Sequence, residues 1–373
     1  MISNCVVMAS MAVLAAAGFQ SGAPTAAPAA AIAPSQQSYF PSDAQMEELV
    51  RTLVERGESK GIVIGLLEPD GRRRIFAYGD AGNGRPPSSR TVFEIGSITK
   101  TFVNVILADM VRRGTVSLDD PVSKFLPAGV NVPSRNGRQI TLLDLATHTS
   151  GLPRSPVGYN IPDPSNPYAQ FREEDLYRFL ASHELQRDIG SEFVYSNLGM
   201  GLLGHALARA AGAASLRELI RKRITGPLGM RSTDYWHESP LLATGHDSKG
   251  KAVPHWDFAV LSGAGALNSN AEDLLTYLDA NIGKPRSRLE LTMRDAQQPR
   301  RPVNAKGDAV GLGWQLRSRA GRTIVHHGGG TGGFQSYIGF DPVARAGVVV
   351  LGNSRGFEAR DDVVFQLLKM PTE

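Results

Sequence analysis

The pattern of apolar and polar positions predicts a helix and a hairpin near the start of the chain. Residues 42–57 carry apolar side chains at helical spacing, with a capping box formed by Ser42 and Gln45 and a stop at Gly57. Residues 61–79 read as two strands around a Pro-Asp-Gly turn, which predicts a β-hairpin.

The rest of the chain predicts helices first and strands afterwards. A long helical pattern follows Ser97 and ends at Gly114, and residues 119–285 alternate helical segments with loops rich in Pro, Gly and Asn. The last part ends in a helix from about Arg360, preceded by predicted strands at residues 310–316, 323–328, 334–341 and 346–353. Strands at both ends predict an α/β (α+β) fold: one antiparallel sheet built from both chain ends, flanked by helices, with a helical subdomain at about 119–285 inserted beside it.

The first 38 residues have a different composition. No charged side chain occurs before Asp43, and the apolar run from Cys5 to Phe19 is short for a membrane span and is followed by Ala/Pro-rich sequence. This predicts a signal peptide with small-residue cleavage options, such as 15–17 or 27–29, and export to the periplasm or medium. A basic segment before the apolar run is missing, so the alternative is an uncleaved segment that associates the protein peripherally with a membrane.

Composition excludes several classes of function. The chain of 373 residues has one cysteine, Cys5, so the mature protein would have no disulfide and no thiolate chemistry. The formal net charge is +4, but it comes from scattered arginines, and no nucleic-acid-reading motif occurs. We therefore expect no nucleic-acid partner; the sequence leaves the oligomeric state open.

Three short stretches carry candidate chemistry. Ser97 and Lys100 lie one helical turn apart, and a lysine held against a serine hydroxyl in a cleft can act as a base. The second stretch is Tyr195-Ser196-Asn197 and the third is the glycine-rich run at 326–334. Each has a simpler explanation by itself: a helix start, a helix cap and a flexible turn.

Two further patterns are set aside. His326 and His327 could form a metal pair, but neighbouring strand residues face opposite sides and no further ligand cluster accompanies them. Residues 57–61 match a Gly-x-Ser-x-Gly pattern around Ser59. That motif needs a strand followed by a helix, and here a helix precedes a strand, so Ser59 is expected in a loop.

In order, type and spacing, the three stretches together resemble the motifs of the penicillin-recognising serine hydrolases. The similarity is to the class C β-lactamase group, which includes low-molecular-mass D-alanyl-D-alanine carboxypeptidase/endopeptidases and some esterases. It extends over the chain after residue 40, with further landmarks at 140–154, 226–233, 264–275 and 311–314. One departure is that His327-Gly328-Gly329 stands where class C β-lactamases have Lys-Thr-Gly, which favours a DD-peptidase or esterase over a specialised β-lactamase.

The resemblance implies a β-lactamase/transpeptidase-like fold and a set of roles. Ser97 would attack an amide or ester carbonyl and form an acyl-enzyme, with Lys100 and Tyr195 as proton carriers; the sequence leaves open which of the two acts first. Asn197 would contact the substrate acylamide. The backbone N–H groups of Ser97 and Gly330 would form the oxyanion hole. Gly329 would let the substrate lie close along the strand, and His327 would also bind the substrate.

His327 would contact the substrate carboxylate or the Tyr195 oxygen. An unperturbed histidine pKa of about 6.5 predicts that carboxylate-bearing β-lactams are used better as the pH falls toward 6. No cofactor and no metal is expected.

Three functions follow from the resemblance. The first is a DD-peptidase or β-lactamase acting on D-Ala-D-Ala peptides of peptidoglycan or on small-molecule β-lactams. The second is a carboxylic-ester hydrolase on the same scaffold, and the third is a non-catalytic penicillin-binding module. The Ser97, Lys100 and Tyr195 set argues against the third.

Overall fold

The computed structural model describes residues 38–235 and 239–371. The predictions of a signal peptide, its cleavage and its single cysteine fall on residues 1–37, outside the described residues. No helix among the described residues has the length and apolar character needed to cross a membrane.

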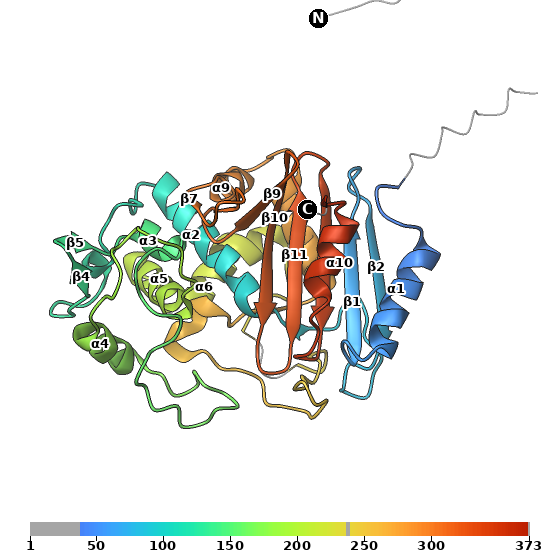
Figure 1. The fold of residues 1–373 in the computed structure, drawn as a ribbon, viewed down its shortest axis with the longest axis horizontal. Helices are drawn as coiled ribbons and strands as arrows, with labels where there is room; N and C mark the ends of the chain where they lie inside the picture. Colours follow the sequence, from blue (N-terminus) through green and yellow to red (C-terminus); the bar gives the residue numbers. More distant parts are fainter. Residues whose placement is uncertain (1–37, 236–238, 372–373) are drawn as a thin grey trace, which may run out of the picture. The chain divides into compact units, whose positions relative to one another are not determined.

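The centre of the fold is an eight-stranded antiparallel sheet that joins the two ends of the chain (Figure 1). In spatial order its strands are β2 (Arg73–Gly79), β1 (Gly61–Leu67), β12 (Ala346–Gly352), β11 (Gln335–Asp341), β10 (Arg322–Gly330), β9 (Gln315–Arg319), β8 (Ala309–Val310) and β7 (Arg301–Pro302). The early strand β1 pairs with the last strand β12, with Ile62 opposite Gly352. The predicted fold class is therefore confirmed.

One strand prediction is wrong. Residues 310–316 do not form a single strand, because β8 ends at Val310 and β9 begins at Gln315. The two strands pair with each other, with Ala309 opposite Leu316, so the intervening residues form the turn of a hairpin. Gly313 makes this turn with a positive φ of 72° and lies against the backbone of Lys100, where a Cβ would be 2.7 Å from the carbonyl oxygen.

The two faces of the sheet bury different helices. On one face α1 (Asp43–Glu55) and α10 (Arg360–Leu367) cover Ile62, Ile64 and the alternate residues of β12. On the other face Val63 joins the core that contains α8 (Ala271–Ile282), α2 (Thr99–Arg112) and α9 (Arg288–Ala296). Because β1 and β12 are buried on both faces of the sheet, each of these strands reads as a continuous apolar run in the sequence. The capping box of α1 is formed as predicted.

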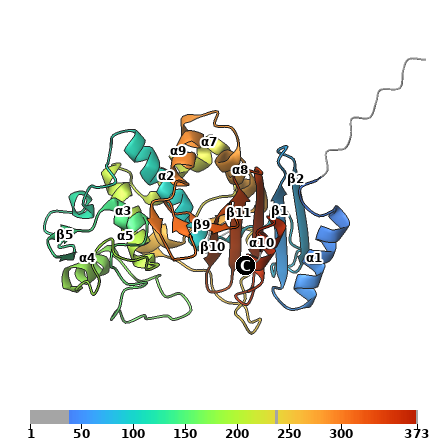
Figure 2. The same cartoon turned by 45° about the horizontal axis from the view of Figure 1, so that its top comes forward.

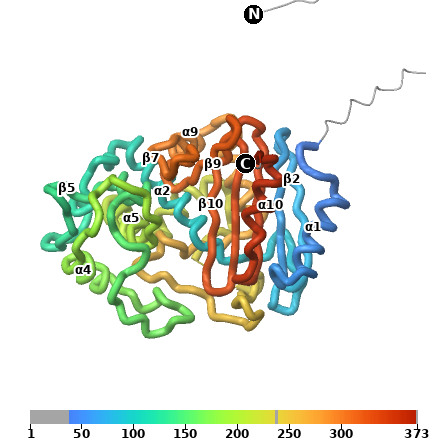
Figure 3. Tube along the Cα trace, in the orientation of Figure 1, coloured from blue at the N-terminus to red at the C-terminus, as the bar shows by residue number. Residues whose placement is uncertain are grey.

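The segment between α2 and α8 contains short helices joined by long loops and lies beside the sheet (Figures 2 and 3). Its α-helices are α3 (Leu142–Ala146), α4 (Glu173–Ser182), α5 (Asn197–Ala210), α6 (Leu216–Ile220) and α7 (Gly226–Leu228). Single turns of other helix types are η1 (Gly96–Ile98), η2 (Val122–Phe125), η3 (Arg221–Thr225) and η4 (Ala259–Ala264). Two small antiparallel pairs complete the fold: the long-range pair of β3 (Phe93–Glu94) with β6 (Asn268–Ser269), and the hairpin of β4 (Ser134–Arg135) with β5 (Arg138–Gln139).

Helix α2 connects the sheet to the helical segment. It packs against α9 beside the sheet and against α5 and η4 in the helical segment, and all its residues from Thr99 to Met110 are buried. The turn η1, which contains Ser97, immediately precedes it and contacts β10. The start of α2 is thus the place where the first candidate motif meets both parts of the fold.

Candidate active site

Ser97 lies on a backbone turn that is fixed from both sides. Gly96 has a φ of 47°, and the carbonyl oxygen of Ile95 accepts a hydrogen bond of 2.9 Å from the Ser336 hydroxyl of β11. On the other side, the Ile95 N–H donates to the carbonyl of Leu267. The serine side chain is partly exposed, so a substrate can reach it.

Lys100 is fully buried and surrounded by oxygen atoms. Its Nζ lies 2.8 Å from Ser97 Oγ, 3.0 Å from Asn197 Oδ1 and 2.5 Å from the carbonyl oxygen of Ala264. Burial lowers the pKa of this amine well below its ordinary value, and the positive charge of Arg154 lowers it further. The direction of this shift favours the neutral amine beside the serine hydroxyl.

Tyr195 lies against the same serine. Burial raises the pKa of its phenol, and the hydrogen bond with Ser97 and the charge of Arg154 act in the opposite direction. Its ring packs on the ring of His148 at 4.5 Å and lies 4.9 Å from Lys100 Nζ. The phenol is therefore protonated near neutral pH and available as a proton donor.

The second motif serves both as a helix cap and as part of the site. Ser196 is the N-cap of α5, and its hydroxyl accepts a hydrogen bond of 2.8 Å from the N–H of Gly199. The Ser196 N–H donates to Nδ1 of His148, which ties α5 to the loop before it. The next residue, Asn197, directs its Oδ1 to Lys100, while its Nδ2 donates to the Tyr168 hydroxyl at 3.3 Å.

The two histidines of the third motif face opposite sides of β10, as expected. His326 contacts Phe365 of α10 and hydrogen-bonds to the Tyr337 hydroxyl at 2.6 Å. The ring of His327 lies 6.3 Å from that of Tyr195, and its Nδ1 is 2.7 Å from the carbonyl oxygen of Gly328.

The expectation of an ordinary His327 pKa is wrong. Burial, reinforced by the charge of Lys100, lowers the pKa of His327 to about 3. The imidazole is therefore neutral near neutral pH. It supplies a hydrogen bond at this position but no positive charge.

Two glycines bring β10 into direct contact with the turn that carries Ser97. A Cβ added to Gly329 would lie 2.1 Å from the carbonyl oxygen of Ile95, and one added to Gly96 would lie 2.6 Å from the nitrogen of Gly330. Only residues without a side chain permit this approach. It places the backbone of Gly330 beside Ser97, as an oxyanion hole requires.

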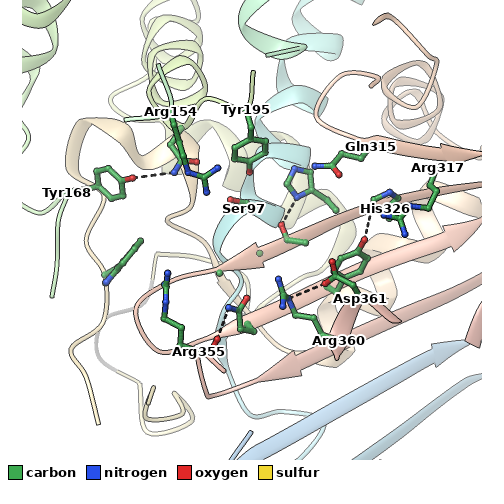
Figure 4. A pocket seen from close by; sticks show the side chains of 18 residues that line it. Ser97, Arg154, Tyr168, Tyr195, Gln315, Arg317, His326, Arg355, Arg360 and Asp361 are labelled. Carbon is green, nitrogen blue, oxygen red and sulfur yellow. Dashed lines mark hydrogen bonds and ion pairs between the residues drawn. The ribbon is translucent and has the colours of Figure 1, made fainter. Parts of the chain in front are cut away.

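These residues border one cavity of about 500 Å³ (Figure 4). Ser97 lies between its two ends; Arg154 and Tyr168 are on one side, and Gln315, Arg317 and His326 are on the other. Ser97, Tyr195, Asn197, His327, Gly329 and Gly330 all contribute to the lining. Within residues 38–235 and 239–371, no group of His, Cys, Asp or Glu side chains is arranged to hold a metal ion.

The structure adds residues that the sequence motifs did not include. Arg154, Tyr168 and Trp256 line the cavity, and the carbonyl of Ala264 holds Lys100. Arg154 and Ala264 fall in stretches already identified as landmarks of the resemblance, at 140–154 and 264–275. That signal pointed to the segments but not to the roles of these atoms.

Ser59 has no part in the site. It lies in the loop between α1 and β1, is buried, and donates a hydrogen bond of 3.0 Å to the carbonyl of Gly61. The Gly-x-Ser-x-Gly match is thus a local loop sequence, as expected.

A sheet flanked by helices, with a serine hydroxyl held by a buried lysine and a tyrosine, defines an acyl-transferring serine hydrolase. Comparison with known proteins agrees with this class. A model of the Beta-lactamase family matches residues 46–369, and the chain belongs to this family.

Individual relatives cover most of the chain. It is 32% identical over 304 residues to the D-alanyl-D-alanine-carboxypeptidase/endopeptidase AmpH of Escherichia coli K12, covering 77% of this chain and 78% of that protein. It is 29% identical over 380 residues to a Beta-lactamase of the same organism, covering 89% and 95%. A solved structure of a Beta-lactamase/D-alanine carboxypeptidase from Yersinia pestis has a TM-score of 0.75 at 26% identity, covering 88% of this chain and 99% of that one.

Proposed function

We propose that this enzyme forms an acyl-enzyme at Ser97 with peptides that end in D-Ala-D-Ala and with β-lactams. The observation that carries the proposal is the buried Lys100 amine with its three oxygen neighbours. A neutral amine has two N–H groups and one lone pair. Donating to Asn197 Oδ1 and to the Ala264 carbonyl leaves the lone pair for the Ser97 hydroxyl proton.

In this mechanism Lys100 is the base of the acylation step. The bond from Ser97 Oγ to the carbonyl carbon forms as the hydroxyl proton moves to Lys100, and the backbone N–H groups of Ser97 and Gly330 stabilise the oxyanion. The C–N bond then breaks. The leaving nitrogen receives the proton of the Tyr195 phenol, which lies beside Ser97, and the proton held by Lys100 then restores this phenol.

The remaining motif residues would bind the substrate. Asn197 is held by Lys100 and Tyr168, so its amide is fixed for the substrate acylamide. Neutral His327 would accept or donate one hydrogen bond near the leaving group. In deacylation, water would enter by the same route, with Tyr195 as the carrier of its proton.

An ester hydrolase is the second candidate, because of one observation. The low pKa of His327 removes the positive charge that would anchor a substrate carboxylate at this position, and esters without a carboxylate do not need that anchor.

The test of the proposed function is labelling by a fluorescent penicillin. We expect a covalent adduct on Ser97 by mass spectrometry, and loss of both the adduct and turnover in Ser97→Ala. Ser59→Ala is the matched control and should label like the wild type. An adduct on any serine other than Ser97 would contradict the mechanism, and turnover of p-nitrophenyl esters without penicillin labelling would favour the esterase.

We further propose that the protein is exported to the periplasm or secreted. The charge-free segment before Asp43 and the small residues within it support this proposal. N-terminal sequencing of the native protein should then begin after Gly18 and before Asp43. Full-length protein in the cytoplasmic fraction would contradict export.

A further inference from the structure

Arg154 places a positive charge at one end of the catalytic cavity. Its carbonyl oxygen accepts hydrogen bonds from the N–H groups of Asn197 and Leu198, at 2.9 and 3.2 Å, so its backbone is fixed at the start of α5. Its guanidinium lies 5.1 Å from the centre of the Tyr195 ring. The side chain is exposed and lines the cavity, where a ligand can reach it.

The charge of Arg154 is not neutralised by the protein around it. Its side chain forms no salt bridge with any carboxylate among residues 38–235 and 239–371. The titratable groups that face it are Lys100, Tyr195 and His148, and its charge lowers the pKa of all three. This charge favours the neutral forms of Lys100 and His148, and burial keeps the Tyr195 phenol protonated in spite of it, so none of the three groups supplies a negative counter-charge.

The position of Arg154 shows which part of the substrate it would meet. It adjoins Asn197, which the proposed function assigns to the acylamide, and lies with Tyr168 on one side of Ser97 (Figure 4). Arg317 lies on the other side of Ser97, on the strand β9 that pairs with β10, and the proposed function assigns the leaving group to the neighbourhood of His327 on β10 (Figure 4). Arg154 therefore faces the acyl side, meaning the part of the substrate that stays on Ser97.

An aromatic wall accompanies this charge. The Tyr168 ring packs edge-on against Trp256 at 5.8 Å, and both line the cavity. The loop carrying Trp256 is held by the buried carboxylate of Glu94, which accepts hydrogen bonds from His255 Nδ1 at 2.8 Å and from the Trp256 N–H at 3.0 Å. This side of the cavity thus combines two aromatic rings with the guanidinium of Arg154, and Arg355 lies on the same side of Ser97 (Figure 4).

We propose that Arg154 is a specificity-determining residue that binds an anionic group on the acyl side of the scissile bond, so that the preferred substrates carry a carboxylate there. The proposal rests on the proposed function and names the substrate class more closely: acyl groups that combine a carboxylate with apolar surface. The carboxylate would pair with the guanidinium in the fork geometry that arginine offers. Its apolar part would pack on Tyr168 and Trp256.

Benzylpenicillin and its α-carboxy analogue carbenicillin form a matched pair of probes. They share the same ring and the same leaving-side carboxylate and differ by one carboxylate on the acyl side. We expect wild-type Ser97 to be acylated faster by carbenicillin, and Arg154→Gln to reduce the ratio of the two acylation constants by about tenfold, the effect of one partly exposed charge-assisted hydrogen bond. Arg154→Lys should restore part of the ratio, because the charge returns without the fork.

A matched control separates a local contact from the general field of the cavity. Arg317→Gln removes the same charge from the other end, and we expect it to affect both penicillins equally, because both have the same leaving-side carboxylate. A reduced ratio in Arg154→Gln alone supports the proposal. An equal loss with both penicillins in Arg154→Gln, or an equal change of the ratio in both variants, overturns it.

The pH profile distinguishes binding from an effect on the base. Because Arg154 contributes to the low pKa of Lys100, Arg154→Gln should also move the acid limb of acylation to higher pH, and equally for both probes. If neither penicillin acylates wild-type Ser97, the proposed function fails. Glutaryl and pentanoyl esters of p-nitrophenol then test Arg154 separately, and the same ratio in wild type and Arg154→Gln overturns the proposal.

Discussion

Replacing Gly329 by alanine should separate β10 from the nucleophile without changing the chemical identity of any motif side chain. The new Cβ would lie 2.1 Å from the Ile95 carbonyl oxygen and 2.3 Å from Ser336 Oγ, whereas real Cβ atoms stay beyond 3.0 Å. The Ser336 side chain can rotate, but the Ile95 carbonyl is backbone. Strand β10 must therefore move away from the turn by roughly 1 Å, because contacts this short are strongly repulsive.

The movement would shift the Gly330 N–H from the position where it stabilises the oxyanion. A displacement of the reacting groups by about 1 Å, or the loss of one oxyanion-hole donor, reduces the rate by about 100-fold or more. We therefore expect the acylation constant with benzylpenicillin to fall by about two orders of magnitude. Overpacking should also destabilise the fold by about 1–3 kcal/mol, seen as a lower Tm.

Gly339→Ala is the matched control for this prediction. It lies on the neighbouring strand β11, where a Cβ would meet the side chain of Val364 at 2.9 Å on the face covered by α10. We expect a similar loss of Tm with little loss of acylation. Near wild-type acylation in Gly329→Ala, measured on folded protein, would refute the requirement for this close approach.

Three further predictions concern charge in the site. Lys100→Met should abolish acylation yet raise the Tm, and the rise should be larger at pH 6 than at pH 9. Folding lowers the lysine pKa, so below the unfolded pKa of about 10.4 the unfolded chain binds a proton that the folded chain does not. The stability of the wild type therefore falls as the pH falls, and the variant lacks this loss. An equal Tm difference at both pH values would contradict a neutral Lys100. Because the pKa of His327 is about 3, the ratio of kcat/KM for a penicillin and a neutral ester should not change between pH 5 and 8 through this residue. His327→Lys should raise the penicillin value by roughly tenfold and leave the ester nearly unaffected; an equal response of both substrates would show that the residue does not contact the carboxylate.

The central strands and the juxtaposition of Ser97 with Lys100 were predictable because their signals are local. Buried strands such as β1 and β12 read as apolar runs between turn residues, and the spacing of Ser97 and Lys100 by one turn already placed the amine beside the hydroxyl. The double role of the Tyr-Ser-Asn stretch is also local: the cap by Ser196 fixes the helix start, which in turn directs Asn197 into the site.

The remaining features depend on contacts between distant segments. The pKa of His327 is set by burial and by Lys100, which lies more than 200 positions earlier in the chain, so the residue type alone suggested an ordinary value. The Ala264 carbonyl that holds Lys100 is a backbone atom, and nothing in its side chain reveals it. Arg154 belongs to a loop, and only the packing of that loop on α5 places its charge beside Tyr195.

The pairing of β1 with β12 has a consequence for the order in which the chain can fold. Since Ile62 meets Gly352, the centre of the sheet must wait for nearly the entire polypeptide, and such distant pairings slow folding. The two ends of the described chain nevertheless meet, because the Tyr39 hydroxyl donates to the Leu368 carbonyl at 3.0 Å and Lys369 Nζ lies 4.1 Å from the Tyr39 ring. A circular permutant that joins these ends by a short linker would turn the most distant strand pair into neighbours in sequence, and it should form its sheet sooner than the natural order allows.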